Sequence, residues 1–209
     1  MGPTDFHERA LIDRGLGPVA GVDEAGRGPL AGPVVAAAVI FDPAVLPPGL
    51  ADSKTLSAKK RADLCDLLRG TVAFGIGQAS VEEIDEMNIL RASHLAMLRA
   101  VAALPNPPRH LLIDGNMIPR DCPHEATALV KGDALALSIA AASILAKVAR
   151  DTIMRDLAQH FPGYGWETNQ GYPSKSHTSA LRDLGVTPHH RRSFAPVRNI
   201  LYQADLPTS

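Results

Sequence analysis

Apolar positions near the start of the chain fall into three short runs that are typical of strands. Residues 18–22 are apolar, residues 33–41 are apolar and partly β-branched, and residues 71–79 alternate β-branched, aromatic and small side chains. Runs of this length and composition predict buried strands. Because the three runs follow one another closely, we expect them to form an antiparallel meander.

Helical spacing of apolar residues alternates with two further strand-like runs. Ser57 is a candidate N-cap for a helix that continues through Leu68, and Ser80 followed by Glu83 matches a capping box. The remaining predicted elements are an amphipathic helix over 88–103, strands over 110–113 and 126–130, and a long helix over 134–160 with an alanine and serine stripe for close packing on a sheet.

This order of elements predicts an α/β fold with a mixed five-stranded sheet flanked by helices. Three antiparallel strands come first, and the last two extend the sheet in parallel. Proline and glycine dominate residues 162–173. They mark the boundary between a catalytic core over 1–161 and a small C-terminal helical and loop segment over 162–209.

The C-terminal segment is the basic part of a chain whose formal net charge is only −1. Between residues 171 and 199 the charged side chains are Lys175, Arg182, Asp183, Arg191, Arg192 and Arg198. Tyr172 and Phe194 lie among them, a combination that favours nucleic-acid binding. The alternative is a solvated tail.

Composition excludes several classes of protein. The chain has 209 residues, of which 45% are hydrophobic and 21% charged, as in a globular protein. No apolar run is long enough to cross a bilayer, and residues 1–20 lack a signal-peptide core. We therefore expect a cytoplasmic protein with no membrane partner. Cys65 and Cys122 match no zinc or redox spacing, and we expect reduced thiols.

Four acidic residues follow strands or precede the long helix. Asp23 and Glu24 end the first predicted strand, Asp114 ends the fourth, and Asp133 stands where the long helix starts. If these positions converge, hard oxygen ligands without nearby cysteine or histidine favour Mg²⁺ or Mn²⁺. Two such ions can drive phosphodiester hydrolysis. The alternatives are a solvated acidic turn for the pair and a helix N-cap for Asp133.

The loop after the acidic pair has the composition of a phosphate or sugar site. Gly26 and Gly28 flank Arg27. Glycine lets backbone N–H groups approach a ligand closely, and an arginine forks onto phosphate oxygens.

Taken in order, these motifs resemble the bacterial type 2 ribonucleases H, the ribonuclease HII family. The resemblance covers residues from about 18 to 198, and it rests on the segments 21–28, 52–54 (Asp52, Ser53, Lys54), 113–115, 131–133, 141–151 and on Gly171, Tyr172 and His177. It implies a ribonuclease-H-like fold and metal-dependent cleavage of the RNA strand of RNA–DNA hybrids. It also implies nicking on the 5′ side of single ribonucleotides in duplex DNA, with 5′-phosphate and 3′-hydroxyl products.

The resemblance assigns expected roles to individual residues. The four metal-binding catalytic carboxylates would be Asp23, Glu24, Asp114 and Asp133, with two Mg²⁺ or Mn²⁺ ions. The backbone of Gly26, Arg27 and Gly28 would sense the 2′-hydroxyl, the group that distinguishes RNA from DNA. Tyr172 would pack on the sugar of the following deoxynucleotide.

Other cations have two interpretations each. Lys54, Lys147 and Arg150 would contact phosphate, or they are solvated or ion-paired, as Lys147 would be with Asp151 four residues on. The run His189, His190, Arg191 and Arg192 would clamp phosphate or close the tail against the core; a metal site at the histidine pair is the weakest interpretation.

Three alternative functions compete with this one. Ribonuclease HIII shares the core but carries an added N-terminal substrate-binding domain, whereas fewer than 20 residues precede the first predicted strand here. A non-catalytic nucleic-acid-binding module would not need four acids. A hydrolase of small phosphate esters would not need the basic, aromatic tail. We expect a monomer that acts on RNA–DNA hybrids and on duplex DNA containing ribonucleotides.

Overall fold

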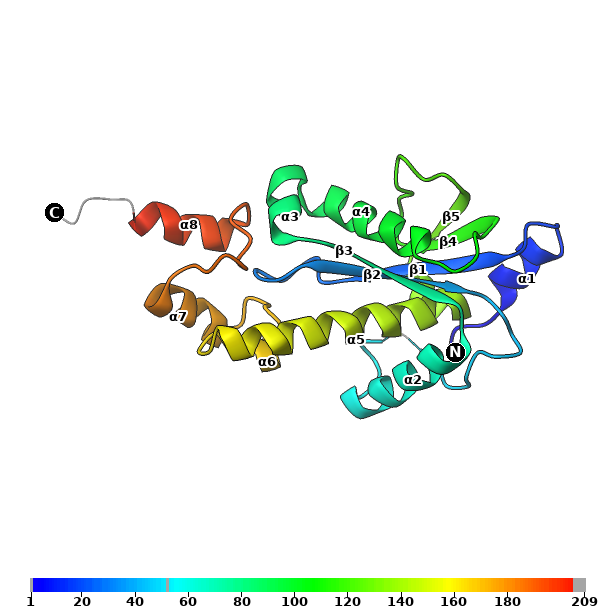
Figure 1. Cartoon of the computed structure of the whole chain (residues 1–209), viewed down its shortest axis with the longest axis horizontal. Helices are drawn as coiled ribbons and strands as arrows, with labels where there is room; N and C mark the ends of the chain where they lie inside the picture. Colours follow the sequence, from blue (N-terminus) through cyan, green and yellow to red (C-terminus); the bar gives the residue numbers. More distant parts are fainter. Residues whose placement is uncertain (1, 52, 205–209) are drawn as a thin grey trace.

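A five-stranded mixed sheet forms the centre of the computed structural model, which describes residues 2–51 and 53–204 (Figure 1). The strands are β1 (Val19–Ala25), β2 (Val34–Ile40), β3 (Phe74–Ala79), β4 (His110–Asp114) and β5 (Glu125–Leu129), in the order β3-β2-β1-β4-β5. β1 pairs antiparallel with β2, as β2 does with β3, whereas β4 runs parallel to β1 and β5 parallel to β4. The predicted sheet is confirmed.

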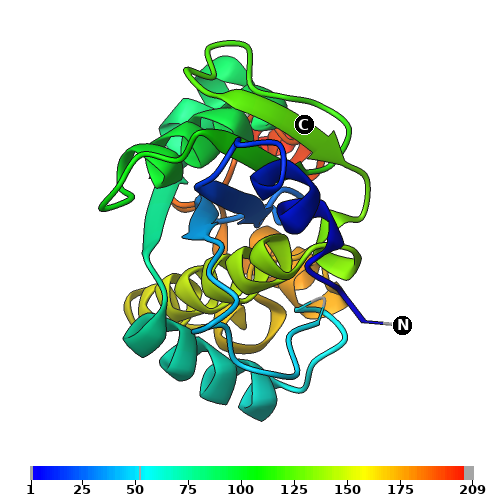
Figure 2. The same ribbon diagram turned by 90° about the vertical axis from the view of Figure 1, so that its right-hand side faces the viewer.

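Helices cover both faces of the sheet. The helices α3 (Val81–Met87) and α4 (Ile89–Ala102) lie on one face, and α5 (Leu137–His160) lies on the other with α2 (Ala58–Thr71) outside it (Figures 1 and 2). α5 approaches β1 closely, because Gly21 leaves no room for a side chain: a Cβ there would meet the backbone of Ser138 and Ile139.

Local sequence signals account for several helix ends. The Ser57 hydroxyl accepts from the Lys60 N–H at the start of α2, and Ser80 and Glu83 form the predicted capping box of α3. Asn88, at φ 73°, separates α3 from α4. The third strand starts later than predicted, at Phe74, because α2 continues to Thr71.

The long helix also starts later than the sequence predicts. A 3-10 turn over Gly132–Ala134 contains Asp133, and α5 begins at Leu137 with Ala136 at its N-cap. Interpreting Asp133 as the N-cap of the long helix is therefore wrong. The turn fits the left-handed backbone of Lys131, at φ 59°, which changes the chain direction before the helix.

Three helices at the C-terminal end gather at one end of the sheet: α6 (Trp166–Asn169), α7 (Lys175–Leu184) and α8 (Ala195–Ala204) (Figure 1). At the opposite end lies α1 (Phe6–Ile12). The C-terminal segment is joined to the loop after β1 by backbone hydrogen bonds from Leu30 N–H to the Gly171 carbonyl, 2.7 Å, and from Gly32 N–H to the His189 carbonyl, 2.9 Å. Within the described residues, every helix is too short or too polar to span a membrane.

Candidate active site

Parallel pairing of β1 and β4 brings three of the four predicted carboxylates to one end of the sheet. Val22 is opposite Ile113 in this pairing, so the next residues, Asp23 and Asp114, lie side by side. Asp23, Glu24 and Asp114 line a cavity of about 440 Å³. Asp133 is buried in the turn after β5, and the N–H of the preceding Gly132 donates to Asp114 Oδ1 at 2.7 Å.

The environment of Asp23 and Glu24 disfavours their negative charge. Burial raises the pKa of Asp23 well above its ordinary value, and the charges of Glu24, Asp114 and Asp133 raise it further. Burial also raises the pKa of Glu24, against the opposing effect of Arg27, whose Nη1 lies 3.3 Å from Glu24 Oε1. Like charges in a buried site repel unless a cation compensates them.

The donor set fits a divalent cation. All four candidates supply carboxylate oxygens, the ligands that Mg²⁺ and Mn²⁺ prefer. The Oε2 atom of Glu24 is buried without a hydrogen-bond partner among the residues that the structure describes. Such an atom is costly unless a ligand satisfies it.

The side chains are not arranged as a closed ligand cage. Across residues 2–51 and 53–204, no three histidine, cysteine, aspartate or glutamate side chains form a group that could hold an ion as they stand. One oxygen each of Asp23, Glu24 and Asp114 accepts from a protein donor: the Glu24 N–H, the Arg27 guanidinium and the Gly132 N–H. These hydrogen bonds hold the three carboxylates beside the cavity.

The Gly26-Arg27-Gly28 loop borders the same cavity. Gly26 has φ +99°, and a Cβ there would overlap the side chain of Arg150. A Cβ at Gly28 would lie 3.4 Å from the ring of Tyr172. The loop therefore borders the cavity and packs closely against Arg150 and Tyr172. Only glycine fits both the backbone conformation and the close contact at position 26.

Tyr172 lines the cavity and is 44% exposed, and a hydrogen bond holds its backbone. Its carbonyl accepts from His177 Nδ1 at 2.9 Å. Trp166 Nε1 donates to His177 Nε2, and His190 lies 3.0 Å from the same nitrogen. Thr187 N–H donates to His190 Nδ1, which leaves the His190 Nε2 proton for His177. Both imidazoles are neutral in this network.

His177 and His190 therefore have a structural role, since together they support the backbone of Tyr172. Burial lowers the pKa of His190 to about 3, and it lowers the pKa of His177 as well. His189 packs edge-on against Phe161, with ring centroids 4.9 Å apart. These contacts account for the histidines without a bound metal.

The predicted cationic residues have different positions. Lys54 and Lys147 line the cavity, and Lys147 pairs with Asp151 at 2.6 Å. Asp52, the first residue of that motif, lies outside the described residues. Arg150 borders the cavity but is 1% exposed, and its guanidinium donates to the carbonyls of Pro33, Gln170 and Ala31. These carbonyls hold the Arg150 guanidinium inside the protein, and its phosphate contact stays a prediction.

Three cavity residues, Ser53, Arg61 and Ser143, were given no role from the sequence alone, although Ser53 and Ser143 lie in segments that carry the family resemblance. Arg61 donates to the carbonyl of Ser53, and the hydroxyls of Ser143 and Ser53 are 2.7 Å apart. Ser143 belongs to the small-residue stripe of α5, which indicates packing and gives no sign of the cavity. Arg61 lies on α2, where an arginine normally faces solvent.

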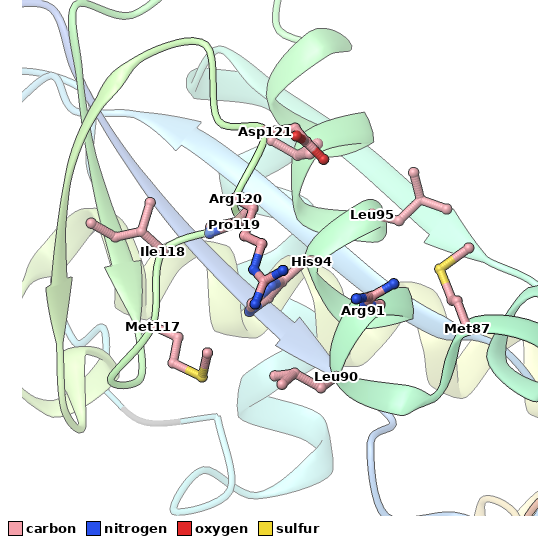
Figure 3. A pocket seen from close by; sticks show the side chains of 11 residues that line it. Met87, Leu90, Arg91, His94, Leu95, Met117, Ile118, Pro119, Arg120 and Asp121 are labelled. Atoms are coloured by element: carbon pink, nitrogen blue, oxygen red, sulfur yellow. The ribbon is translucent and has the colours of Figure 1, made fainter.

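A second cavity, of about 540 Å³, has a different character (Figure 3). It lies between α4 and residues 117–121, which follow β4. Its lining is mainly apolar, with cationic groups from Arg91 and Arg120, His94, and a single acid, Asp121. One carboxylate cannot form the predicted constellation, whereas the first cavity contains three of its four acids.

Comparisons with known proteins agree with this geometry. The family model described as ribonuclease HII matches residues 20–197. A ribonuclease HII of Ruegeria sp. (strain TM1040) is 64% identical over 196 residues, which cover 94% of this chain and 86% of that protein. The crystal structure of ribonuclease H2 from Pyrococcus horikoshii OT3 superposes with a TM-score of 0.73 at 29% identity, covering 88% of this chain and 97% of that one.

A more distant structure, Bst-RNase HIII in complex with Mn²⁺, has the same fold at 21% identity and a TM-score of 0.74, and covers 94% of this chain and 73% of that chain. The family model and the curated relative both span most of the chain. The chain is therefore a hydrolase of the ribonuclease HII family.

Proposed function

We propose that this chain hydrolyses the RNA strand of RNA–DNA hybrids and also nicks duplex DNA on the 5′ side of single embedded ribonucleotides. Family membership supports the ribonuclease H activity and its dependence on divalent metal. The observation that carries the finer proposal is the meeting of the acids with a glycine-flanked loop and an aromatic ring in one cavity. Asp23, Glu24 and Asp114 line it together with the Gly26-Arg27-Gly28 loop and Tyr172.

In this proposal Asp23, Glu24, Asp114 and Asp133 hold two Mg²⁺ or Mn²⁺ ions. When bound, the ions supply an activated water and stabilise the leaving 3′-oxygen of the scissile phosphodiester. The buried position of Asp23 and its three acidic neighbours supports a ligand role, because the carboxylates need a cation to compensate them. Gly132 N–H holds Asp114 through Oδ1, which fixes the direction of its other oxygen.

The loop and Tyr172 provide substrate selection in this proposal. Backbone N–H groups of residues 26–28 would bond the 2′-hydroxyl, and the exposed ring of Tyr172 would pack on the sugar that follows. Lys54 and Lys147 would approach phosphates from the other side of the cavity. Residues 162–209, described as far as 204, would act as the substrate-binding segment beside a catalytic core of residues 1–161.

We further propose a cytoplasmic monomer. Cys65 and Cys122 are free thiols, which fits a reducing compartment. One chain supplies acids, loop and aromatic ring to the same cavity, so the candidate site needs no second copy.

The decisive experiment maps cleavage sites on labelled duplexes with no ribonucleotide, one ribonucleotide or a long RNA strand, in Mg²⁺ and then in Mn²⁺. We expect a nick on the 5′ side of the lone ribonucleotide and none in plain DNA. Cleavage of long hybrids alone would refute the single-ribonucleotide activity. Binding without metal-stimulated cleavage would refute catalysis.

A matched pair of variants tests the carboxylate assignment. Asp114→Asn removes a candidate ligand and is expected to lower kcat/KM by at least about a hundredfold, since even residues behind a ligand contribute 10–100-fold. Asp121→Asn removes an exposed acid seven positions further along the same loop, outside the catalytic cavity. It should leave cleavage unchanged. Equal activity of the two variants would remove Asp114 from the site.

A further inference from the structure

The side chain of Arg191 is buried against the loop that follows β1 and donates to its main-chain oxygens. Nη1 lies 3.0 Å from the Arg27 carbonyl, and Nη2 lies 2.6 Å from that of Gly26. Nε and Nη2 also reach the carbonyls of Gly32 and Pro33, at 2.9 and 3.2 Å. Arg191 is 0% exposed, and its guanidinium carbon is 5.1 Å from the centre of the Phe194 ring.

Two of these four carbonyl groups, those of Gly26 and Arg27, belong to the peptide bonds that join Gly26 to Arg27 and Arg27 to Gly28. In a trans peptide the C=O and the following N–H point in opposite directions. The only cis bond among the described residues is Gly17-Pro18. Fixing the Gly26 and Arg27 carbonyls therefore aims the N–H groups of Arg27 and Gly28 away from Arg191.

Gly26, Arg27 and Gly28 line the cavity, whereas Arg191 does not line it and is fully buried. The face of the loop opposite Arg191 is therefore taken as the face that borders the cavity. A guanidinium bonded to a carbonyl also polarises the peptide unit and strengthens its N–H as a donor. The buried cation thus acts on the geometry and on the donor strength of the same two amides.

Closing the tail against the core does not by itself account for a guanidinium at this position. Burial, and after it the neighbouring charge of Arg150, lower the pKa of Arg191 to about 9, so the site disfavours a cation. Well-packed apolar residues of similar volume commonly replace buried charged groups without loss of stability. The four carbonyl groups that its guanidinium bonds explain why an arginine occupies this position.

We propose that Arg191 is a positioning residue for recognition of the 2′-hydroxyl, holding the Arg27 and Gly28 amides toward the ribose at the cleavage site. This proposal rests on the proposed function, because it takes the substrate of that cavity to contain a ribonucleotide. Arg191 itself touches no substrate. It acts through the main chain of the loop from a position more than 160 residues away in the sequence.

The test measures binding and cleavage separately. Binding is measured in chelator, with a duplex that carries one ribonucleotide and with the same duplex made of DNA alone. We expect the unsubstituted protein to prefer the ribonucleotide duplex, and Arg191→Lys to lose about tenfold of that preference, as for the loss of one good hydrogen bond. Affinity for the all-DNA duplex should stay the same. Single-turnover cleavage in Mg²⁺ should fall in parallel.

Phe194→Leu is the matched control, because it loosens packing around the same guanidinium and leaves the carbonyl bonds in place. It should lower the melting temperature and keep the preference. The proposal is overturned if a folded Arg191→Lys variant keeps the preference, or if the unsubstituted protein has none. Failure of the proposed function is distinguishable, since it appears as absence of cleavage by the unsubstituted protein.

A second measurement needs no substitution and covers the case in which Arg191→Lys does not fold. In ¹H–¹⁵N spectra of the unsubstituted protein, the ribonucleotide duplex should shift the amide signals of Arg27 and Gly28 and the Nε–Hε signal of Arg191. The all-DNA duplex should shift them less. Equal shifts with both duplexes would overturn the proposal.

Discussion

The buried charge of Asp23 destabilises the folded protein, yet the proposed chemistry needs a carboxylate at this position. The side chain is 5% exposed, and the charges of three other acids raise its pKa in addition to the effect of burial. Functional sites often carry groups that the fold would replace if stability alone mattered. Stability and activity should therefore respond in opposite directions to a substitution at this residue.

Asp23→Asn is expected to raise the melting temperature in chelator by about 2–4 °C, the shift that about 1 kcal/mol produces in a protein of this size. The reason is removal of a buried like charge by a side chain of nearly the same shape. Metal-dependent nicking should be lost. Calorimetry and a nicking assay on the same preparation check both effects. A lower melting temperature would contradict the electrostatic account.

Tyr172 allows a test of the aromatic contact. Tyr172→Ala should lower kcat/KM on a duplex with one ribonucleotide by about tenfold, since stacking contributes about 1–3 kcal/mol per contact. Tyr172→Phe keeps the ring and should stay within about twofold of the unsubstituted protein. If phenylalanine is as damaging as alanine, the hydroxyl matters and the packing role is wrong.

Sequence motifs predicted which acids meet in the cavity better than the residues that hold the surrounding main chain. Asp23 and Glu24 lie near the end of β1 and Asp114 ends β4, and that placement brings them to one cavity. Arg150 and Arg191 are different, because their partners are main-chain carbonyls more than 100 residues away for Pro33, Ala31 and Gly26. A carbonyl has no side-chain signal in a sequence, so a phosphate contact and a structural brace could not be distinguished.

At the scale of elements, the distance between α5 and β1 sets the position of the acids. Gly21 lies two residues before Asp23, and a Cβ there would meet the backbone of Ser138 and Ile139 at 2.3 and 2.4 Å. The buried carboxylate of Glu8 also accepts from the N–H and hydroxyl of Ser138, which fixes the start of α5. α5 therefore has little freedom to move away from β1.

Gly21→Ala is expected to destabilise the protein by about 1–3 kcal/mol, the usual cost of overpacking a core. Gly70→Ala is the control: Gly70 lies in α2, and a Cβ added there would have nothing within 4 Å, so alanine should stabilise by up to about 1 kcal/mol. Urea unfolding measures both. Similar effects of the two substitutions would show that α5 moves freely.

Periodicity and capping predicted the elements of the core and some of their ends. The caps at Ser57 and Ser80 were visible because their hydroxyls act within three residues. The 3-10 turn around Asp133 was missed, because the bonds that form it involve the backbone and the Asp114 side chain. The short helix α1 was also missed, since its stabilising contact, from Glu8 to Ser138, spans 130 residues.

For the molecule as a whole, the two buried histidines couple stability to pH. Burial lowers the pKa of His190 to about 3 and also lowers the pKa of His177, whereas an unfolded histidine titrates near 6.5. Below pH 6.5 the unfolded chain therefore binds protons that the folded chain does not. Stability contributed by these neutral histidines is present above pH 6.5 and is lost as the pH falls toward 3.

We expect the free energy of unfolding to fall by up to about 1.4 kcal/mol per pH unit for each histidine between pH 6.5 and 5. Asp23 and Glu24 act in the opposite sense, because their raised pKa values favour proton uptake by the folded chain. His190→Asn should flatten the acid side of the profile, and His160→Asn, at an exposed position, should not. Identical profiles would contradict the assignment.

The hydrogen bonds between the loop after β1 and the C-terminal segment also determine which part of the site forms last while the chain is being synthesised. Residues 26–33 leave the ribosome early, yet the groups that hold them, at 171 and 189–191, are made near the end. A nascent chain would thus possess its acidic strands before its loop is braced. Discrimination between ribose and deoxyribose would be acquired last, when Arg191 closes over the finished loop.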